Sequence, residues 1–197
     1  QRLARALTEA GPSFIKLGQI LATRSDLLGE DLAKDLSDLQ DRLPPFPSAD
    51  ACKTIEAEFG CQLEEIFKTF IEKPVAAASI AQVHFAVTPD GQEVAVKILR
   101  PNIEAAFARD LDLLKWGANL IERTRPDLRR LKLSEVVQTL ADSVDIEMDL
   151  RFEAAAAVEL LENFKDDPDF QVPKVDWSRT SKRVMTTERI EGISMDD

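Results

Sequence analysis

The stretch that decides the fold runs from residue 76 to residue 100 and reads AAASIAQVHFAV, TPDG and QEVAVKILR. Two apolar, β-branched runs flank Pro89-Asp90-Gly91. Proline presets one backbone angle, and aspartate and glycine tolerate the left-handed angles of a tight connection. The pattern therefore predicts a β-hairpin that is entered through an alanine-rich loop and carries Lys97 on its second strand.

Composition indicates a folded globular protein and excludes several functions. The chain has 197 residues, of which 44% are hydrophobic and 31% are charged. Its net charge of −11 repels nucleic acid, and no basic stripe with interleaved aromatic residues offsets that charge, so we expect no nucleic-acid partner. One histidine and two isolated cysteines, Cys52 and Cys61, exclude a zinc knuckle and a Ser-His-Asp triad within the chain.

The hydrophobic pattern also bears on how the chain relates to membranes and to a longer protein. No apolar run approaches the roughly 20 residues of a membrane helix, and no signal peptide opens the chain, so we expect a soluble chain. The chain begins at Gln1 in the middle of a pattern rather than at a methionine, and it stops just after an apolar strand. We therefore expect a fragment of a longer protein.

Hydrophobic periodicity predicts an α+β fold, with a helical extension over residues 1–65 and a sheet-containing lobe over residues 66–197. The extension is expected to contain helices at about 2–10, 12–24, 30–43 and 48–59, the last capped by Ser48 or Asp50. The lobe is expected to contain strands at about 69–75, 79–88, 92–99 and 183–190, and long helices at about 102–124 and 134–165.

Lys97 is the first candidate for chemistry. It stands among apolar strand residues and shares a strand face with Ala95 and Leu99, a face that could form a cleft. A lysine on an edge strand also deters aggregation, so the residue alone does not decide between the two interpretations.

Acidic residues on the predicted helix 134–165 are the second candidate. Asp149 and Glu153 lie one turn apart on a shared face, while Glu147 lies about 120° from Glu153. Glu153 could therefore pair with Lys97, with Glu147 directed to another neighbour. The alternative is a solvated acidic helix face.

Three further features have two interpretations each. Lys16 and Gln19 flank Gly18 inside an apolar helix, which indicates a close helix contact or a polar site at its rim. His84 is predicted to be a packed strand residue rather than a ligand. A basic cluster is either a solvated loop, the commoner case, or a site for anionic lipid or a partner; its members are Arg123, Arg125, Arg129, Arg130 and Lys132.

Taken in order along the chain, these features resemble the UbiB family of atypical, protein-kinase-like proteins. The order of small-residue loop, strand, turn and Val-Ala-Val-Lys strand is that of a kinase small lobe, with alanines in place of its phosphate-covering glycines. The motifs that carry the resemblance are Lys16-Leu17-Gly18-Gln19, Ala76 to His84, Val94 to Lys97, Glu147-Met148-Asp149 and Glu153-Ala154-Ala155.

The resemblance implies a role for each matching position. Lys97 would grip nucleotide phosphates, with Glu153 as its helix partner. Lys16 and Gln19 would belong to a helix that crosses the cleft, where Lys16 would meet Glu147 and Asp149. The resemblance gives the loop over the nucleotide to Ala76, Ala77, Ala78 and Ser79, the gatekeeper and first hinge positions to Thr187 and Glu188, and the backbone facing adenine to the region of Ile190.

The resemblance also implies what the longer parent does. It would bind ATP, or ADP after hydrolysis, with Mg²⁺ held by a large lobe beyond residue 197. It would support ubiquinone biosynthesis through quinone-precursor lipids or the enzymes that modify them, at the cytoplasmic face of a bacterial inner membrane. Membrane association is expected only through the C-terminal part of the parent, and the fragment alone is expected to be inactive.

One departure and two rival functions stand beside this interpretation. Ala156 occupies a position where family members often carry asparagine. The first rival is a non-catalytic nucleotide- or lipid-binding scaffold of a biosynthetic complex. The second is a helical interaction domain with no nucleotide role.

Overall fold

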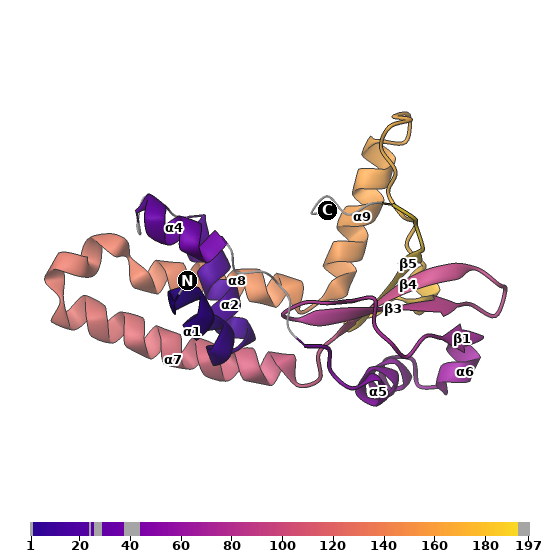
Figure 1. The fold of residues 1–197 in the computed structure, drawn as a ribbon, viewed down its shortest axis with the longest axis horizontal. Coiled ribbons are helices and arrows are strands. Elements are labelled where there is room, and N and C mark those ends of the chain that lie inside the picture. Colours follow the sequence, from indigo (N-terminus) through magenta and orange to yellow (C-terminus); the bar gives the residue numbers. More distant parts are fainter. Residues whose placement is uncertain (1, 24, 26–28, 38–43, 193–197) are drawn as a thin grey trace. The chain divides into compact units, whose positions relative to one another are not determined.

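The computed structural model describes residues 2–23, 25, 29–37 and 44–192 of the chain (Figure 1). The chain forms two compact units, each assembled from separate segments. The helical unit comprises residues 1–43, 78–80 and 102–146, and the sheet unit comprises residues 44–77, 81–101 and 147–197. The division into residues 1–65 and 66–197 stays a prediction.

The helical unit begins with short helices that pack on one another. Helix α2 contacts α1, α4 and α7. Gly11, with a φ of +117°, separates α1 from α2, and Pro12 opens α2 because its missing N–H is not needed there. The bounds are α1 Arg2–Ala10, α2 Pro12–Ala22 and α4 Glu30–Ser37. These confirm the predicted starts; the rest of the predicted helix 30–43 lies outside the described residues.

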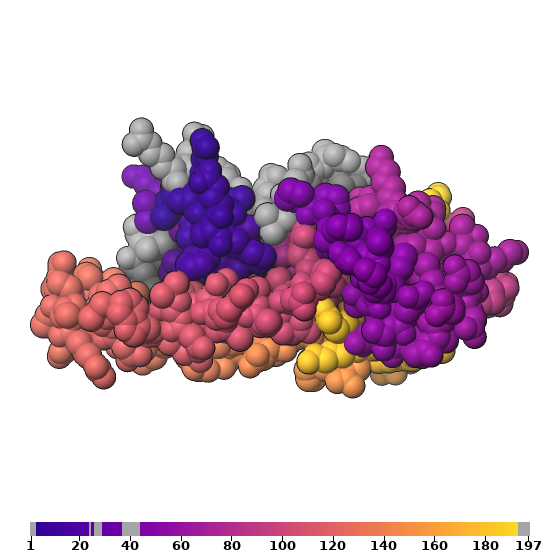
Figure 2. Space-filling view, turned by 90° about the horizontal axis from the view of Figure 1, so that it is seen from below, coloured from indigo at the N-terminus to yellow at the C-terminus, as the bar shows by residue number. Residues whose placement is uncertain are grey.

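Two long helices complete this unit as a helical hairpin (Figure 1), and a short 3₁₀ helix joins them. Phe107, Leu111 and Ala118 recur on one buried face of α7. Figure 2 shows a continuous stretch of α7 surface, in pink to salmon, that no other element covers in that view. The bounds are α7 Ile103–Thr124, η1 Pro126–Leu131 and α8 Leu133–Glu147.

The sheet unit is built on an antiparallel sheet with strand order β1-β3-β4-β5, and β2 also pairs with β3. Gly91 N–H donates to Thr88 O, and Gly91 has a φ of +91°, which confirms the predicted turn. The predicted strand 69–75 was too long, since β1 ends at Phe70, although Ile71 N–H and Val75 N–H still donate to the β3 carbonyls of Phe85 and Val83. The bounds are β1 Thr69–Phe70, β2 Ala76–Ala77, β3 Ala81–Val87, β4 Glu93–Leu99 and β5 Val184–Glu188.

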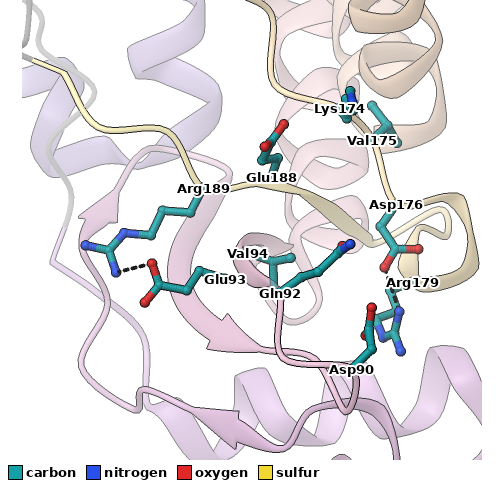
Figure 3. Close-up of a pocket in the computed structure, with 10 residues that line it drawn as sticks. All are labelled: Asp90, Gln92, Glu93, Val94, Lys174, Val175, Asp176, Arg179, Glu188 and Arg189. Atoms are coloured by element: carbon teal, nitrogen blue, oxygen red, sulfur yellow. Dashed lines mark hydrogen bonds and ion pairs between the residues drawn. The ribbon is translucent and has the colours of Figure 1, made fainter.

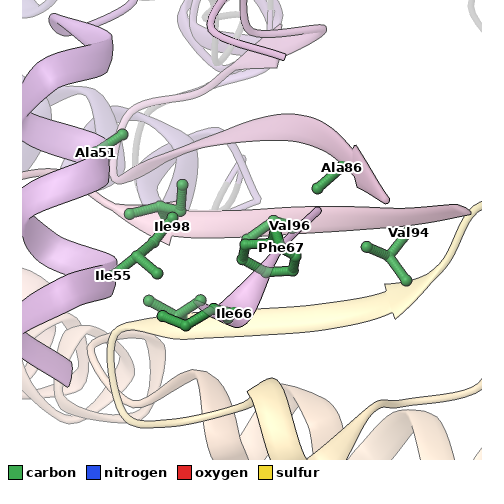
Figure 4. Packing of buried hydrophobic residues seen from close by; sticks show 9 residues of the cluster. Ala51, Ile55, Ile66, Phe67, Ala86, Val94, Val96 and Ile98 are labelled. Carbon is green, nitrogen blue, oxygen red and sulfur yellow. The ribbon is translucent and has the colours of Figure 1, made fainter. Parts of the chain in front are cut away.

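One face of the sheet carries the hydrophobic core of this unit. Helices α5 (Ser48–Phe59) and α6 (Leu63–Ile66) cover it. Ile55 and Phe67 reach the alternate residues Val96 and Ile98 of β4 (Figure 4). Gly60 ends α5 in the left-handed conformation. The predicted capping by Ser48 or Asp50 was wrong, because Pro47 holds the N-cap position without a side-chain bond.

The predicted helix 134–165 is two helices. Helix α8 ends at Glu147, and α9 spans Leu150–Asn163. Asp149 starts α9 by accepting a hydrogen bond from Arg151 N–H, since aspartate competes for backbone donors and favours helix ends. Leu150 N–H donates to Lys182 O, which ties the start of α9 to the segment before β5.

Within the described ranges, no helix combines the length and the apolar character that crossing a bilayer would require.

Candidate functional site

The central feature of the sheet unit is an ion pair between β4 and α9. Lys97 Nζ lies 2.8 Å from Glu153 Oε1 and 2.7 Å from Glu153 Oε2, so one ammonium bridges both carboxylate oxygens. The Lys97 side chain is 30% exposed and the Glu153 side chain 49% exposed. The pairing predicted from the sequence is therefore present. An ion pair this open contributes at most about 1 kcal/mol to stability, so its main effect is to orient the lysine.

Strand register shows which residues share a face with the lysine. Val83 and Met185 are directly opposite Lys97 on the neighbouring strands, and Phe85 and Thr187 are opposite Ala95. Because strand side chains alternate, these residues lie on the face opposite the α5-covered core. This open face is where a ligand would meet the lysine.

The open face also holds an arginine that sequence reasoning missed. The Arg189 guanidinium lies 4.2 Å from the centre of the Phe85 ring, a cation–π distance. Its Nη1 lies 3.6 Å from Glu93 Oε2, and its backbone N–H donates to Glu93 O. Among the described residues its buried Nε has no hydrogen-bond partner. No local pattern could have found this contact, because Phe85 and Arg189 are brought together only by the sheet.

Asp149 holds the start of α9 in place. Arg151 Nη2 lies 2.6 Å from Asp149 Oδ2, and Arg151 Nε lies 2.9 Å from Oδ1. The hydrogen bonds from the Arg151 side chain lower the pKa of the Asp149 carboxyl, with partial burial opposing and the backbone bond assisting. Asp149 is therefore a carboxylate at neutral pH, and it fixes the turn that precedes Glu153.

The alanine-rich loop is divided between the two units. Ala76 and Ala77 form β2 and pair with Val83 and Gln82, so they belong to the sheet. Ala78 and Ser79 belong to the helical unit, where Ser79 is buried. Their role over a nucleotide stays a prediction.

Lys16 and Gln19 lie half-buried on α2 of the helical unit. Ser13 on the same helix is fully buried and donates its hydroxyl to the Asp110 carboxylate on α7. Glu147 and Asp149 belong to the sheet unit. The predicted approach of Lys16 to these two carboxylates therefore stays a prediction.

The predicted hinge residues lie at the end of β5. Glu188 N–H donates to Lys174 O, and Ile190 is 47% exposed. Glu188 lines a cavity of about 670 Å³ that does not include Lys97 or Glu153 (Figure 3). The other charged residues of its wall are Asp90, Glu93, Lys174, Asp176, Arg179 and Arg189.

This cavity has a fixed ion pair at one side. Arg179 Nη1 lies 2.7 Å from Asp176 Oδ2, and Arg179 Nε donates to Ile66 O (Figure 3). Burial raises the pKa of Asp176, but hydrogen bonds from Ser178 and Arg179 outweigh it and leave the pKa lowered. The hydrogen-bonded Asp176–Arg179 pair therefore fixes this side of the cavity wall, and Arg189 belongs both to that wall and to the open face.

His84 has a structural role, as predicted. It is fully buried on the core face, where its Nδ1 lies 2.8 Å from Ile71 O and its Nε2 lies 2.8 Å from Gln82 Nε2. A carbonyl beside Nδ1 and an amide donor beside Nε2 fit the neutral ring with its proton on Nδ1. Burial lowers the pKa of His84, with the Ile71 carbonyl opposing, which agrees with a neutral ring.

A five-stranded antiparallel sheet whose Val-Ala-Val-Lys strand pairs its lysine with a helix glutamate is the arrangement of a protein-kinase-like small lobe. Comparison with known proteins agrees. The ABC1 atypical kinase-like domain matches residues 38–197. The chain belongs to this family of atypical, UbiB-type kinase-like proteins.

The relatives found cover the whole chain. A "Probable protein kinase UbiB" of Marinobacter nauticus is 46% identical over 196 residues, and one of Pseudomonas paraeruginosa is 45% identical. The chain spans 36% and 37% of their lengths, just over a third. A solved structure, the complex of Rv3197 with erythromycin from Mycobacterium tuberculosis, is similar with a TM-score of 0.66 and 33% identity, over 92% of this chain and 44% of that one.

Proposed function

We propose that the sheet unit is the nucleotide-binding small lobe of an atypical kinase or ATPase, and that Lys97 contacts the nucleotide phosphates. The observation that carries this proposal is the Lys97–Glu153 ion pair on the open face of the sheet. In protein kinases the equivalent lysine contacts the α- and β-phosphates while a helix glutamate holds it. Both groups here are accessible enough to receive a ligand.

The residues present fit the triphosphate better than they fit the metal. An ammonium held by a carboxylate suits a phosphate oxygen. Among the described residues no group of three or more His, Cys, Asp or Glu side chains could hold a metal ion. We therefore assign the protein ligands of Mg²⁺ to the large lobe of the parent.

ATP would supply the transferable phosphoryl group and the free energy of its hydrolysis. Lys97 would orient the phosphates, Glu153 would orient Lys97, and the apolar residues Val83 and Phe85 would line the open face beside the lysine. The alanine loop hinders backbone amides from closing around phosphates as glycines do, so we expect weak phosphoryl transfer to protein substrates.

We further propose that the parent uses ATP in support of ubiquinone biosynthesis, acting on quinone-precursor lipids or on the enzymes that modify them, at the cytoplasmic face of the bacterial inner membrane. The relatives' name, "Probable protein kinase UbiB", supports a ubiquinone-related, kinase-like role, and the substrate and the location are part of the proposal alone. We expect the 197-residue chain by itself to bind nucleotide weakly and not to catalyse.

The test is Mg²⁺-dependent ATP hydrolysis by the full-length parent and by its Lys97→Ala variant. We expect the variant to lose most of the activity. Equal rates would refute the enzymatic proposal and would favour a non-catalytic scaffold. A thermal midpoint that ATP analogues leave unchanged would favour an interaction domain without a nucleotide.

A further inference from the structure

The outer face of α7 carries an apolar stripe that no described element of the helical unit covers. Leu113, Trp116 and Leu120 follow one another at spacings of three and four residues, which places them on one side of the helix. They are 57%, 64% and 44% exposed, whereas the opposite side of α7 is buried. An indole this exposed beside two leucines is typical of a surface that docks onto something else.

The stripe leads into the basic cluster at the tip of the hairpin. Residues 115–135 contain six basic and three acidic side chains, in a chain whose net charge is −11. Arg123 continues the stripe three residues beyond Leu120. Among the residues that the structure describes, Arg123 and Arg130 have no carboxylate partner, so their charges are not neutralised locally.

The tip is held in shape by its other charges. Arg125 pairs with Asp127 at 2.8 Å, and Lys132 pairs with Glu135 at 2.9 Å. Arg129 Nε donates to the carbonyl of Glu122. A cavity of about 440 Å³ lies between the end of α7 and the start of α8, with three cations, Arg123, Arg129 and Lys132, and two carboxylates, Glu122 and Glu135, in its wall. The tip therefore keeps an excess of cations at the end of α7 toward which the apolar stripe runs.

We propose that this surface, which we call the α7 surface (Leu113, Trp116, Leu120, Arg123, Arg129 and Arg130), docks onto an anionic phospholipid bilayer. The apolar stripe would enter the boundary between headgroups and acyl chains, where tryptophan is enriched, and the arginines would contact lipid phosphates.

Charge complementarity favours a bilayer over a protein partner. The rest of the chain is strongly acidic, so an anionic membrane would repel most of the molecule and attract the tip of the hairpin alone. The stripe lies along one side of a single helix. A bilayer needs no matching shape. This proposal is independent of the nucleotide function, and its test contains no nucleotide.

The test measures co-sedimentation of the 197-residue chain with vesicles of equal parts phosphatidylglycerol and phosphatidylcholine, and with pure phosphatidylcholine vesicles. We expect binding to the anionic vesicles that weakens at high salt. The double variant Arg123→Gln/Arg130→Gln should bind about 25-fold more weakly, since each cation near an anionic surface contributes roughly fivefold. Lys68→Gln/Lys73→Gln, which removes two exposed lysines of the sheet unit, should bind as the unaltered chain does.

A fluorescence measurement tests the apolar stripe. The chain has two tryptophans, so Trp177→Phe leaves Trp116 as the only one. Its emission should shift to the blue with anionic vesicles and be quenched by brominated acyl chains. Leu113→Ser/Leu120→Ser should abolish both effects, whereas Phe152→Ser/Leu160→Ser, two exposed positions on α9, should abolish neither.

Three results would overturn the proposal. The first is that the chain, shown to be folded by circular dichroism, does not bind anionic vesicles. The second is that it binds neutral vesicles equally well, and the third is that both α7-surface variants bind as the unaltered chain does. Competition by millimolar glycerol phosphate would also overturn it, because it would indicate a site for a small anion rather than for a membrane.

Discussion

Replacing Lys97 with alanine separates a role in stability from a role in binding. The Lys97–Glu153 pair is 30% and 49% exposed at its two side chains, so in the absence of ligand it contributes only about 0.2–1 kcal/mol. The variant leaves Glu153 open to water and should fold almost as stably as the unaltered chain. A hydrogen bond from the lysine to a charged phosphate is larger, about 1.5–3 kcal/mol. Affinity for ATP should therefore fall about 10- to 150-fold.

Two measurements check this prediction. Urea denaturation of the 197-residue chain gives the free energy of unfolding, and titration calorimetry of the full-length parent with a non-hydrolysable ATP analogue gives the affinity. Lys68→Ala, an exposed lysine of the same unit, is the control and should change neither. The reasoning is refuted by an affinity as high as that of the control, or by an unfolding change above about 2 kcal/mol, which would make the pair structural.

Three other perturbations test the surroundings of the pair. Burial lowers the pKa of His84 below its ordinary 6.5, so on acidification the unfolded chain binds the proton first. The free energy of unfolding should therefore be at its full value above that pH and fall below it. His84→Gln should remove this slope in urea denaturation between pH 5 and 7, and an unchanged slope would contradict the neutral-ring assignment. Asp149→Ala should lower the free energy of unfolding by about 1 kcal/mol, because α9 loses its cap. Asp149→Asn, which keeps a capping oxygen, should be close to the unaltered chain. If Asp149→Ala has the same unfolding curve as the unaltered chain, the cap contributes nothing to stability. Glycine placed singly at positions 76 to 78 of the full-length parent should tighten ATP binding by freeing the backbone amides, and unchanged affinity in all three variants would count against the loop assignment.

Local sequence signals predicted the hairpin well because its geometry is set by neighbouring residues. The turn at Pro89-Asp90-Gly91 and the alternating strands need no distant contact to be recognised. The pairing of Lys97 with Glu153 is different, since 55 residues intervene between them. Helix periodicity made the pairing possible but left a solvated acidic face as the alternative, and the order of motifs that resembles a known family favoured the pairing.

The failures of prediction fall where tertiary or capping interactions outweigh helical periodicity. The run from 134 to 165 is rich in alanine and glutamate, and its periodicity passes through Asp149 without a sign of the break. The break is caused by a side-chain cap at Asp149 and by the bond from Leu150 to Lys182, and the second of these comes from a segment far along the chain. The Arg189–Phe85 contact was missed for the same reason.

The two faces of β4 explain how one hairpin both stabilises the fold and presents a reactive lysine. Val94, Val96 and Ile98 point into the core beneath α5 and α6, while Ala95 and Lys97 point to the open face. An antiparallel sheet is stable with one face covered, so the core beneath α5 frees the other face from packing. A cation on that open face keeps its hydration and needs only one carboxylate to orient it, whereas burial between two layers would require full compensation of its charge. Lys97 can therefore be charged, held in one direction and accessible to an anionic ligand at the same time.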